Sequence, residues 1–419
     1  MAAGLLLPGC TREWIANTGA HFIPWEPKLE TPNENIAEKH EDVWQRVSQE
    51  PSIWRGEIMM LYGLIALYIP MYKTLVTILQ QYKPDLLVID RAVIPAMDLA
   101  QKMNLPYIIQ TRFLGNFVPV SSKYPRFGTS YSIHMNLWQR CLNFIRPYWL
   151  LVHFLPAIRK LNQVRKQCTA AKKLNDPFSQ KSMIVGTAFG IEIPRPLPPF
   201  VQMVGPIHPK KLEPLSLSLS KWLEEGKELI GVVYIAFGTL ATIQPWQAKA
   251  LVEGLTDSRF KVLWSLPKSQ QHILPALPPS FHIVDFVPQQ TVLSHPLVRV
   301  FVSHCSPNGI NESLYWAKPI LGLPFFGDQH YFAARVVDLG AGLKLNKQHF
   351  DSSEVRSKID ALLSIPSYTD AAHQMSAVLK STGGLNKAAD IVESVLATDN
   401  FHQPEYPTKR EIKQLPAVY

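Results

Sequence analysis

The stretch that decides the fold begins at Phe286. It reads Phe286-Val-Pro-Gln-Gln-Thr-Val-Leu-Ser-His-Pro296, then Val298-Arg-Val-Phe-Val-Ser303, then His304-Cys-Ser-Pro-Asn-Gly-Ile-Asn-Glu312. The apolar run that ends at Ser303 predicts a strand, and the residues after it predict a helix, so together they form half of a βαβ unit. Ser306 suits the N-cap, and Pro307 suits the first helical position because its missing N–H would have no partner there. The stretch therefore predicts an α/β fold with parallel strands.

The start of this helix also predicts an anion site. The backbone N–H groups of Gly309 and its neighbours are expected to lack partners, and the positive end of the helix dipole favours a phosphate. Gly309 has no Cβ, so a ligand can approach the backbone closely. Glu312 lies on the same helix face, where its carboxylate can accept from ribose hydroxyls. His304 follows the strand, at the end where open α/β sheets bind ligands. These features together predict a site for a nucleoside diphosphate.

With the following Pro319-Ile-Leu-Gly-Leu-Pro324 and Phe325-Phe-Gly-Asp-Gln329, the stretch resembles the donor-binding signature of the family 1 UDP-dependent glycosyltransferases. The matching positions are Pro288, Gln289, Leu293, His295, Phe301, His304, Asn308, Glu312, Pro324, Asp328 and Gln329. The resemblance implies the GT-B fold, in which two Rossmann-like, doubly wound domains face each other. It also implies a UDP-sugar donor that is a substrate, with no resident cofactor and no metal ion.

The resemblance assigns roles to the donor-site residues. Phe286 stands where the family has Trp and would stack on uracil, while backbone groups of Val287 would pair with the base edge. Gln289 and Glu312 would bind the ribose. An ordinary structural interpretation stays open for Phe286 as a core aromatic residue and for Glu312 as a solvated helix residue.

The remaining donor-site residues would bind the diphosphate and the sugar. The diphosphate set consists of Thr239, His304, Ser306, Asn308 and Gly309. Ser306 and Gly309 differ from the family, which has Gly and Ser at those places, and His304 could instead be structural. Asp328 and Gln329 would bind hydroxyls of the transferred sugar, and Gln at the second position favours glucose.

The chemistry that the resemblance implies is direct displacement at the anomeric carbon, with inversion. A base takes the proton of the acceptor hydroxyl while the helix N-terminus stabilises the departing UDP. In the family this base is a His in the first βα loop, oriented by an Asp that matches Asp90. That His has no counterpart here, because the chain is expected to lack the first β-α-β segment of the acceptor domain, and His21 falls in the wrong loop. Asp90 could alternatively cap the helix that follows it.

Two functional hypotheses therefore stay open. The first is a UDP-hexosyltransferase, and the aromatic residues of 111–178 favour a small lipophilic acceptor. The second is a catalytically inactive nucleotide-sugar-binding protein or regulatory partner. A GT-B nucleotide-sugar epimerase is a more distant alternative.

Composition, charge and cysteine content limit the class of protein and its cellular compartment. The 419 residues are 47% hydrophobic and 18% charged, which is typical of a globular protein with two domains. The net charge of +9 is spread along the chain, so we expect no nucleic-acid partner. Cys10, Cys141, Cys168 and Cys305 form neither a metal motif nor a disulfide pattern, and with no secretory signal they indicate the cytoplasm or a cytosolic membrane surface.

The predicted division of the chain is an incomplete acceptor domain (1–207), a linker (208–225), a donor domain (226–398) and a tail (399–419). Residues 53–83 predict a long helix, whose apolar part is interrupted by Pro70 and is expected to be buried or to touch a membrane. Two further helices are predicted at 136–145 and 156–174. A strand is also predicted near Trp14 to Trp25, and peripheral membrane contact is a further expectation.

Overall fold

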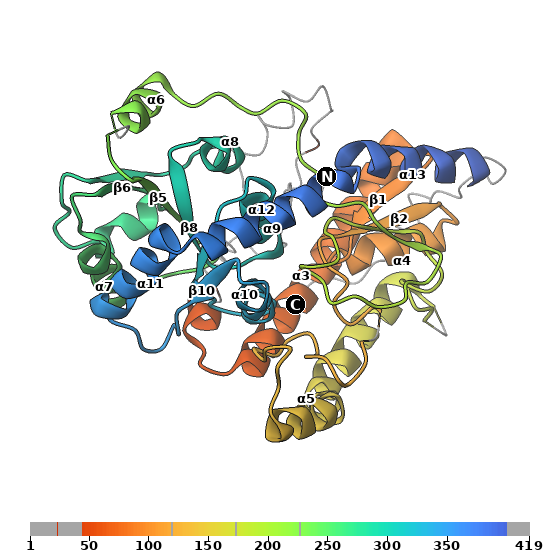
Figure 1. The fold of residues 1–419 in the computed structure, drawn as a ribbon. Coiled ribbons are helices and arrows are strands. Elements are labelled where there is room, and N and C mark those ends of the chain that lie inside the picture. Colours follow the sequence, from red (N-terminus) through yellow and green to blue (C-terminus); the bar gives the residue numbers. More distant parts are fainter. Residues whose placement is uncertain (1–22, 24–43, 119, 172–173, 226–227, 400–419) are drawn as a thin grey trace.

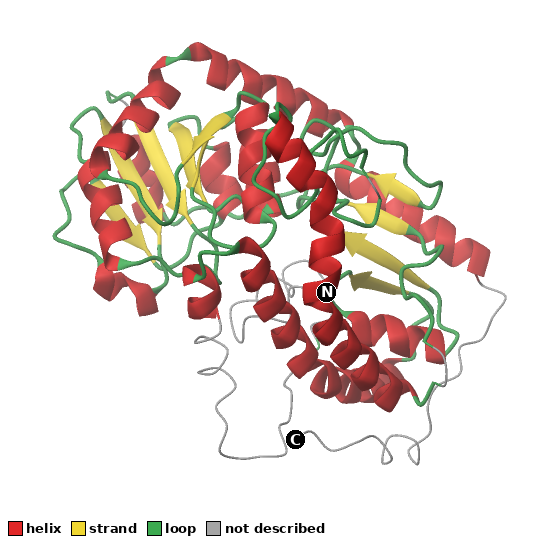
Figure 2. Ribbon diagram, turned by 90° about the horizontal axis from the view of Figure 1, so that it is seen from below, coloured by secondary structure: helices red, strands yellow, loops and turns green. Residues whose placement is uncertain are grey.

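The computed structural model describes residues 23, 44–118, 120–171, 174–225 and 228–399. In this part of the chain the strands form two sheets, one of four strands and one of six. All strand pairs within them are parallel, and helices cover the sheets (Figures 1 and 2). The prediction of two doubly wound domains is confirmed.

The first sheet has the order β1-β2-β3-β4. Its strands are β1 (Leu87–Asp90), β2 (Tyr107–Thr111), β3 (Met183–Val185) and β4 (Val201–Met203). β1 lies at one edge of this sheet, where Val88 is 42% exposed. The predicted strand near Trp14 to Trp25, and the expectation that a leading β-α-β segment is missing, concern residues outside the described part of the chain.

The second sheet has the order β10-β9-β8-β5-β6-β7. Its strands are β5 (Gly231–Ala236), β6 (Phe260–Ser265), β7 (Phe281–Val284), β8 (Val298–Ser303), β9 (Ile320–Gly322) and β10 (Gly342–Lys344). From β5 the chain builds the sheet toward β7, and it then returns to β8 on the other side of β5. Because the strand order reverses between β5 and β8, a crevice opens at their carboxyl ends, which is where such sheets bind ligands.

Helices alternate with the strands of the second domain. They are α7 (Pro245–Leu255), the 3-10 helix η2 (Lys268–Ile273), α8 (Gln289–Ser294), α9 (Pro307–Tyr315), α10 (Gln329–Asp338), α11 (Ser352–Ser364) and α12 (Pro366–Ser381). α9 begins as predicted, with Ser306 as N-cap and Pro307 in the first turn.

Three segments pack differently from the predicted division of the chain. α6 (Leu217–Glu224) lies within the predicted linker, yet its Leu219 and Leu223 are buried in the second domain. These two leucines are one helical turn apart, and the Pro- and Ser-rich composition around them concealed this amphipathic signal. α13 (Gly384–Asp399) belongs to the predicted donor domain but covers the first sheet, where Ile391 joins Ile108.

The third segment is a short helix at residues 44–49, which packs on the second domain although it precedes the first sheet. Val47 is fully buried in the core of the second domain. Lys347 holds this segment, since its Nζ donates to the carbonyl oxygens of Ser48 (2.9 Å) and Glu50 (2.7 Å). Burial lowers the pKa of Lys347 to about 8.

The first domain contains α3 (Ile53–Tyr82), α4 (Ile94–Lys102) and α5 (Leu137–Thr169). α5 is one continuous helix with Pro147 and Pro156 inside it, so the prediction of two separate helices was wrong. Each proline removes only one backbone hydrogen bond, and packing on both sides of the prolines keeps the helix together, as the buried Asn143 and Ala157 show. α3 and α5 are also long and apolar enough to cross a membrane, by length and composition only.

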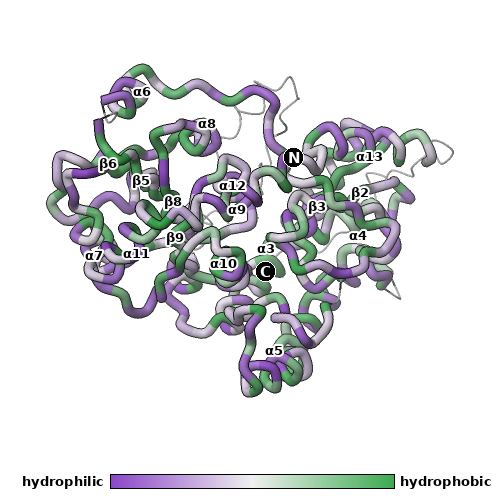
Figure 3. The backbone as a smooth tube through the Cα atoms, in the orientation of Figure 1, coloured by the Kyte–Doolittle hydropathy of each residue, from purple (hydrophilic) through white to green (hydrophobic). Residues whose placement is uncertain are grey.

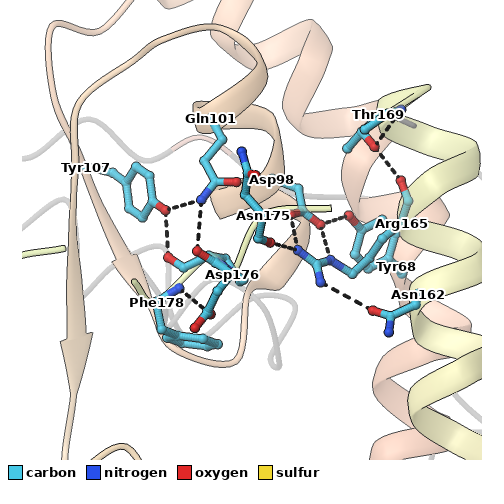
Figure 4. Close-up of polar contacts among 12 residues, drawn as sticks. Tyr68, Asp98, Gln101, Tyr107, Asn162, Arg165, Thr169, Asn175, Asp176 and Phe178 are labelled. Carbon is cyan, nitrogen blue, oxygen red and sulfur yellow. Dashed lines mark hydrogen bonds and ion pairs between the residues drawn. The ribbon is translucent and has the colours of Figure 1, made fainter. Parts of the chain in front are cut away.

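A buried polar network ties α5 to α3 and α4 (Figure 4). The Arg165 guanidinium donates twice to the Asp98 carboxylate, at 2.7 Å from Nε and 2.7 Å from Nη2. The Tyr68 hydroxyl donates to the same carboxylate at 2.5 Å, and Arg165 Nη2 also donates to the Asn175 carbonyl at 2.9 Å. The network fixes the C-terminal half of α5 against the first domain.

Candidate active site

A cleft of about 710 Å³ lies between the two domains. One wall follows the carboxyl ends of β5 and β8, and the other follows the carboxyl ends of β1 and β2. The structure brings all of the predicted site residues together along this cleft: Asp90, Thr239, Phe286, Val287, Gln289, His304, Ser306, Asn308, Gly309, Glu312, Asp328 and Gln329. Their convergence at the strand-order reversal supports a ligand site, and their individual roles stay predictions.

The N-terminus of α9 differs in one respect from the predicted phosphate seat. The Gly309 N–H is not free, because it donates to the Ser306 hydroxyl at 3.3 Å. The expected N-cap and the expected free N–H compete for the same group, and the cap takes it. The next N–H, of Ile310, donates to the Ser306 carbonyl at 3.0 Å, whereas that of Asn308 has no partner in the described part of the chain. Asn308 is therefore the backbone donor that this turn offers to an anion.

His304 and Gly238 meet across the strand-order reversal. Gly238 has a φ of 72°, a left-handed conformation that favours glycine. A Cβ at this position would lie 3.0 Å from His304 Nε2. Burial lowers the pKa of His304 to about 4, although its contact with the Ala236 carbonyl acts in the opposite direction. The imidazole is therefore neutral at neutral pH and can donate a hydrogen bond without adding charge.

Gln289 and Glu312 form a pair, as expected for residues that bind the same group. Gln289 Nε2 donates to Glu312 Oε2 at 2.5 Å, and the Tyr234 hydroxyl lies 3.4 Å from Gln289 Oε1. Burial raises the pKa of Glu312, while Gln289, Gln290 and Arg112 lower it. Glu312 is half-buried in the cleft and hydrogen-bonded to Gln289, so the alternative of a merely solvated helix residue is wrong.

Phe286 and Val287 lie at one end of the cleft. Phe286 is 52% exposed, so the alternative of a core aromatic residue is wrong. Val287 is buried, which fixes the backbone beside the ring. A planar base can stack on an aromatic side chain held in this way.

The opposite end of the cleft contains Asp328 and Gln329. The side-chain oxygen of Gln329 accepts from the N–H groups of Phe325 (2.8 Å) and Phe326 (3.2 Å). Its amide N–H groups make no hydrogen bond within the described residues, so they can donate to a sugar. Burial raises the pKa of Asp328 to about 6, against the opposing effect of Arg91 and Arg112.

Asp90 ends β1 on the other wall of the cleft. Its Oδ1 accepts from the Ala92 N–H at 2.9 Å, and its Oδ2 lies 3.9 Å from Arg112 Nη1. Val93, not Asp90, is the N-cap of α4, so the helix-capping alternative is wrong. Ala92 and Arg112 thus hold the carboxylate in place on the acceptor side, while His21 lies outside the described residues.

Comparison with known proteins decides the family. Residues 34–396 match the family model for UDP-glucoronosyl and UDP-glucosyl transferase. This chain is a member of that family. It is 31% identical to UDP-glycosyltransferase 1 of Phaeomoniella chlamydospora over 365 residues, which are 82% of this chain and 74% of the relative. It is 25% identical to UDP-glucuronosyltransferase 2B14 of Oryctolagus cuniculus, and there the match covers 73% of this chain but only 59% of the relative.

Solved glycosyltransferase structures show the same GT-B fold. The glycotransferase of kitacinnamycin aligns with a TM-score of 0.60 at 17% identity, over 92% of this chain and 89% of that one. A variant of Os79 from O. sativa, solved in complex with UDP, aligns with a TM-score of 0.58 at 18% identity, over 80% and 82% of the two chains. The GT-B architecture expected from the sequence is confirmed.

Two residues that line the cleft of this glycosyltransferase were not predicted from the sequence. Arg91 directly follows β1 and Arg112 directly follows β2, and both line the cleft. The half-buried Arg91 guanidinium lies over the Phe113 ring, 3.9 Å from its centroid. Both positions could have been found from the rule that ligands bind at the carboxyl ends of parallel strands. These arginines give the acceptor-side wall a positive character.

Cys305 lies in the donor motif but is unsuited to act as a nucleophile. It is fully buried, and burial raises the pKa of its thiol. Its φ of 63° places the chain in the left-handed region between His304 and the cap of α9. Cys141 and Cys168 are also free thiols. No group of three or more His, Cys, Asp or Glu residues suited to a metal was found within the residues that the structure describes.

Proposed function

We propose that this chain transfers a hexose from a UDP-sugar to a hydroxyl of a small lipophilic acceptor, with inversion at the anomeric carbon. The observation that carries this proposal is the convergence of the donor-motif residues on one cleft that Asp90 faces from the other domain. The UDP-sugar enters as a substrate. We place the reaction in the cytoplasm or at a cytosolic membrane surface, as the sequence led us to expect, and we propose no nucleic-acid partner.

In this proposal the UDP-sugar lies along the cleft from Phe286 to Asp328. Uracil stacks on Phe286, the Gln289–Glu312 pair accepts and donates at the ribose, and the diphosphate lies at the start of α9. Thr239 and His304 reach the diphosphate from the ends of β5 and β8. Asp328 and the free amide of Gln329 bind sugar hydroxyls, because a carboxylate with an amide can match paired hydroxyl groups.

Displacement at the anomeric carbon moves negative charge onto the departing UDP. The Asn308 N–H, the helix dipole of α9 and the Arg112 guanidinium can stabilise that charge. The proton of the acceptor hydroxyl must be removed from the opposite side of the sugar. Among the described residues, Asp90 supplies a carboxylate on that side of the cleft, and it either accepts the proton or orients the group that does.

The identity of the hexose has two candidates. Gln329 favours glucose, as its place in the motif implies. Glucuronic acid is supported by a different observation, because Arg91 and Arg112 add positive charge near Asp328 and could pair with a sugar carboxylate. Several relatives are also named UDP-glucuronosyltransferases.

A second candidate function is UDP-sugar binding without transfer. It is favoured by the surroundings of Asp90, whose ionic neighbour is Arg112 rather than a histidine. Within the described part of the cleft, His304 is the only histidine, and its pKa near 4 makes it a weak base. A protein with this arrangement could hold the donor and regulate a partner.

The experiment combines calorimetry with a UDP-release assay. The full chain is titrated with UDP, UDP-glucose and UDP-glucuronic acid, and UDP release is followed with a panel of sterols, terpenoids and phenols. Binding with acceptor-dependent release supports transfer, and Asp90→Asn should then lose release while it keeps UDP affinity. Binding without release supports the regulatory alternative, and no binding of any of the three refutes the donor site. Arg112→Leu should weaken the binding of UDP-glucuronic acid more than that of UDP-glucose if the transferred sugar is acidic.

A further inference from the structure

The N-terminal half of α5 exposes an unusual concentration of apolar side chains. More of the exposed large hydrophobic residues belong to this helix than to any other described element. They are Leu137, Trp138, Leu142, Phe144, Ile145, Tyr148, Trp149, Leu151, Val152 and Leu155. Exposed patches of this kind mark interaction sites on soluble proteins. We call these residues the α5 apolar face.

The apolar face is continuous because its members recur at helical spacing. Trp138, Leu142, Ile145, Trp149 and Val152 follow one another at intervals of four and three residues, so they form a stripe along one side of the helix. Trp138 is 70% exposed and Val152 is 68% exposed. The second series, which begins at Leu137, lies beside this stripe and broadens it.

The protein-facing side of the same helix segment is the more polar one. Asn143 is fully buried, and its side chain bonds to Arg126 N–H (2.9 Å) and to the carbonyl groups of Ser122 (3.1 Å) and Tyr124 (2.8 Å). Arg146 donates to the Gly128 carbonyl. A helix that faces water normally has the opposite arrangement, with its apolar side turned to the core. The arrangement here suits a helix whose outer side faces an apolar medium.

Charge indicates which medium this is. No Asp or Glu occurs between Leu137 and Thr169. Arg140 lies near the first end of the apolar face, while Arg159 and Lys160 follow its last members, and all three are exposed. Such basic residues are attracted to anionic lipid headgroups, and Trp and Tyr side chains favour the boundary between headgroups and acyl chains.

We propose that the α5 apolar face docks this protein on an anionic lipid bilayer, with the helix lying in the interface. α5 lies at one margin of the molecule, at the bottom of Figures 1 and 3. It does not need to cross the bilayer, because its other side is held by protein. The Asn143 side chain is bonded to the backbone of residues 122–126, and Arg165 is bound to Asp98. This proposal stands independently of the transfer reaction.

Vesicle flotation of the full chain tests the proposal. The vesicles contain phosphatidylcholine and phosphatidylserine at about seven to three, compared with phosphatidylcholine alone. The variant Trp138→Glu/Ile145→Glu/Val152→Glu should bind at least about tenfold more weakly, because the apolar area that enters the interface sets the affinity. The control Leu217→Glu/Leu277→Glu/Val378→Glu replaces exposed apolar residues on other elements and should float like the unmodified protein.

A second variant tests the charge argument separately. The affinity of Arg159→Gln/Lys160→Gln for vesicles with phosphatidylserine should be lower by about fivefold for each charge removed. Its affinity for phosphatidylcholine vesicles should stay unchanged. Bilayers with brominated acyl chains should quench less of the tryptophan fluorescence in Trp138→Phe than in the unmodified protein.

Three results would overturn the proposal: no flotation of the unmodified protein, equal flotation of the triple-Glu variant, or equal losses in the control. A fourth such result would come from sedimentation equilibrium. A dimer that the triple-Glu variant dissociates, without vesicle binding, would show that a second copy covers the face. Because the replaced side chains are exposed, circular dichroism and thermal unfolding should stay unchanged, which keeps a loss of binding distinct from a loss of fold.

Discussion

Replacing Glu312 with Gln should weaken UDP binding sharply. The substitution keeps the size and shape of the side chain but removes the charge, and it places an amide NH2 where a carboxylate oxygen now accepts. Gln289 Nε2, which donates to that oxygen at 2.5 Å, would then meet a donor instead of an acceptor. The pair could be restored only if one of the two amides turned over, and the ribose would lose an acceptor in either arrangement.

The magnitude follows from the hydrogen bonds that change. A hydrogen bond to a charged group contributes about 1.5–3 kcal/mol net. Loss of one such bond to a ribose hydroxyl corresponds to about 10- to 150-fold weaker binding of UDP. Glu312→Ala should lose at least as much, since it also leaves Gln289 without its partner.

Isothermal titration calorimetry with UDP, at one pH and one salt concentration, measures this difference. Glu253→Gln is the matched control, because Glu253 is an exposed helix residue whose carboxylate lies 3.8 Å from Lys249. A change of less than about threefold in Glu312→Gln would contradict the assigned ribose contact, because it is below the contribution of one charged hydrogen bond. An equal loss in Glu253→Gln would show that the effect has nothing to do with the cleft.

Three further substitutions test the structure at other places. Burial raises the pKa of Glu57 from 4.5 to about 7, so the folded state holds a proton that the unfolded state has released, and stability falls as pH rises through this range. Glu57→Gln removes this effect. The difference in the free energy of unfolding, Glu57→Gln minus the unmodified protein, should therefore increase by up to about 3 kcal/mol as the pH rises from 4.5 to about 7, as measured by urea denaturation. Gly238→Ala should lower the melting temperature and weaken UDP binding, since a left-handed non-glycine residue costs about 1–2 kcal/mol and the new Cβ would crowd His304. Asp98→Ala should cost about 3–5 kcal/mol in urea denaturation, because it leaves Arg165 buried without its partner.

Each of these has a control and a result that contradicts it. A difference between Glu57→Gln and the unmodified protein that stays constant with pH would show that Glu57 titrates normally. Gly63→Ala is the control for Gly238→Ala, because a Cβ there meets nothing within 4 Å, and it should leave UDP binding unchanged. Glu253→Ala should change stability by no more than about 0.5 kcal/mol, and a similar small loss in Asp98→Ala would show that the buried pair contributes little.

Much of the fold could be predicted because local signals agreed with tertiary packing. β8 occupies the predicted residues 298–303, and α9 begins with the predicted N-cap, Ser306. The predicted break in α5 was wrong because a proline need not end a helix that packing holds on both sides of it, as the buried Asn143 and Ala157 do here. No pattern within residues 384–399 indicates which of the two sheets α13 covers.

The site could be predicted where the motif determined the geometry. The motif brings His304, Glu312 and Asp328 to one cleft because they follow consecutive strands of one sheet. The capped state of the Gly309 N–H follows from the predicted N-cap Ser306, because an N-cap hydroxyl accepts from the N–H three residues on, so the expectation of a free N–H at Gly309 was wrong. The position of Arg112 after β2 could have been predicted, but its contact with Asp90 could not, because side chains that meet across neighbouring strands leave no local pattern.

The return of α13 to the first sheet has a consequence for synthesis on the ribosome. Ile108, Ile184 and Val204 are all translated well before Ile391, which covers them. A nascent first domain therefore presents one uncovered apolar sheet face during translation of the entire second domain. Chaperones that recognise exposed apolar strands have that whole interval in which to bind. Premature termination before residue 384 would leave this face permanently uncovered, so we expect such products to aggregate even when their second domain has folded.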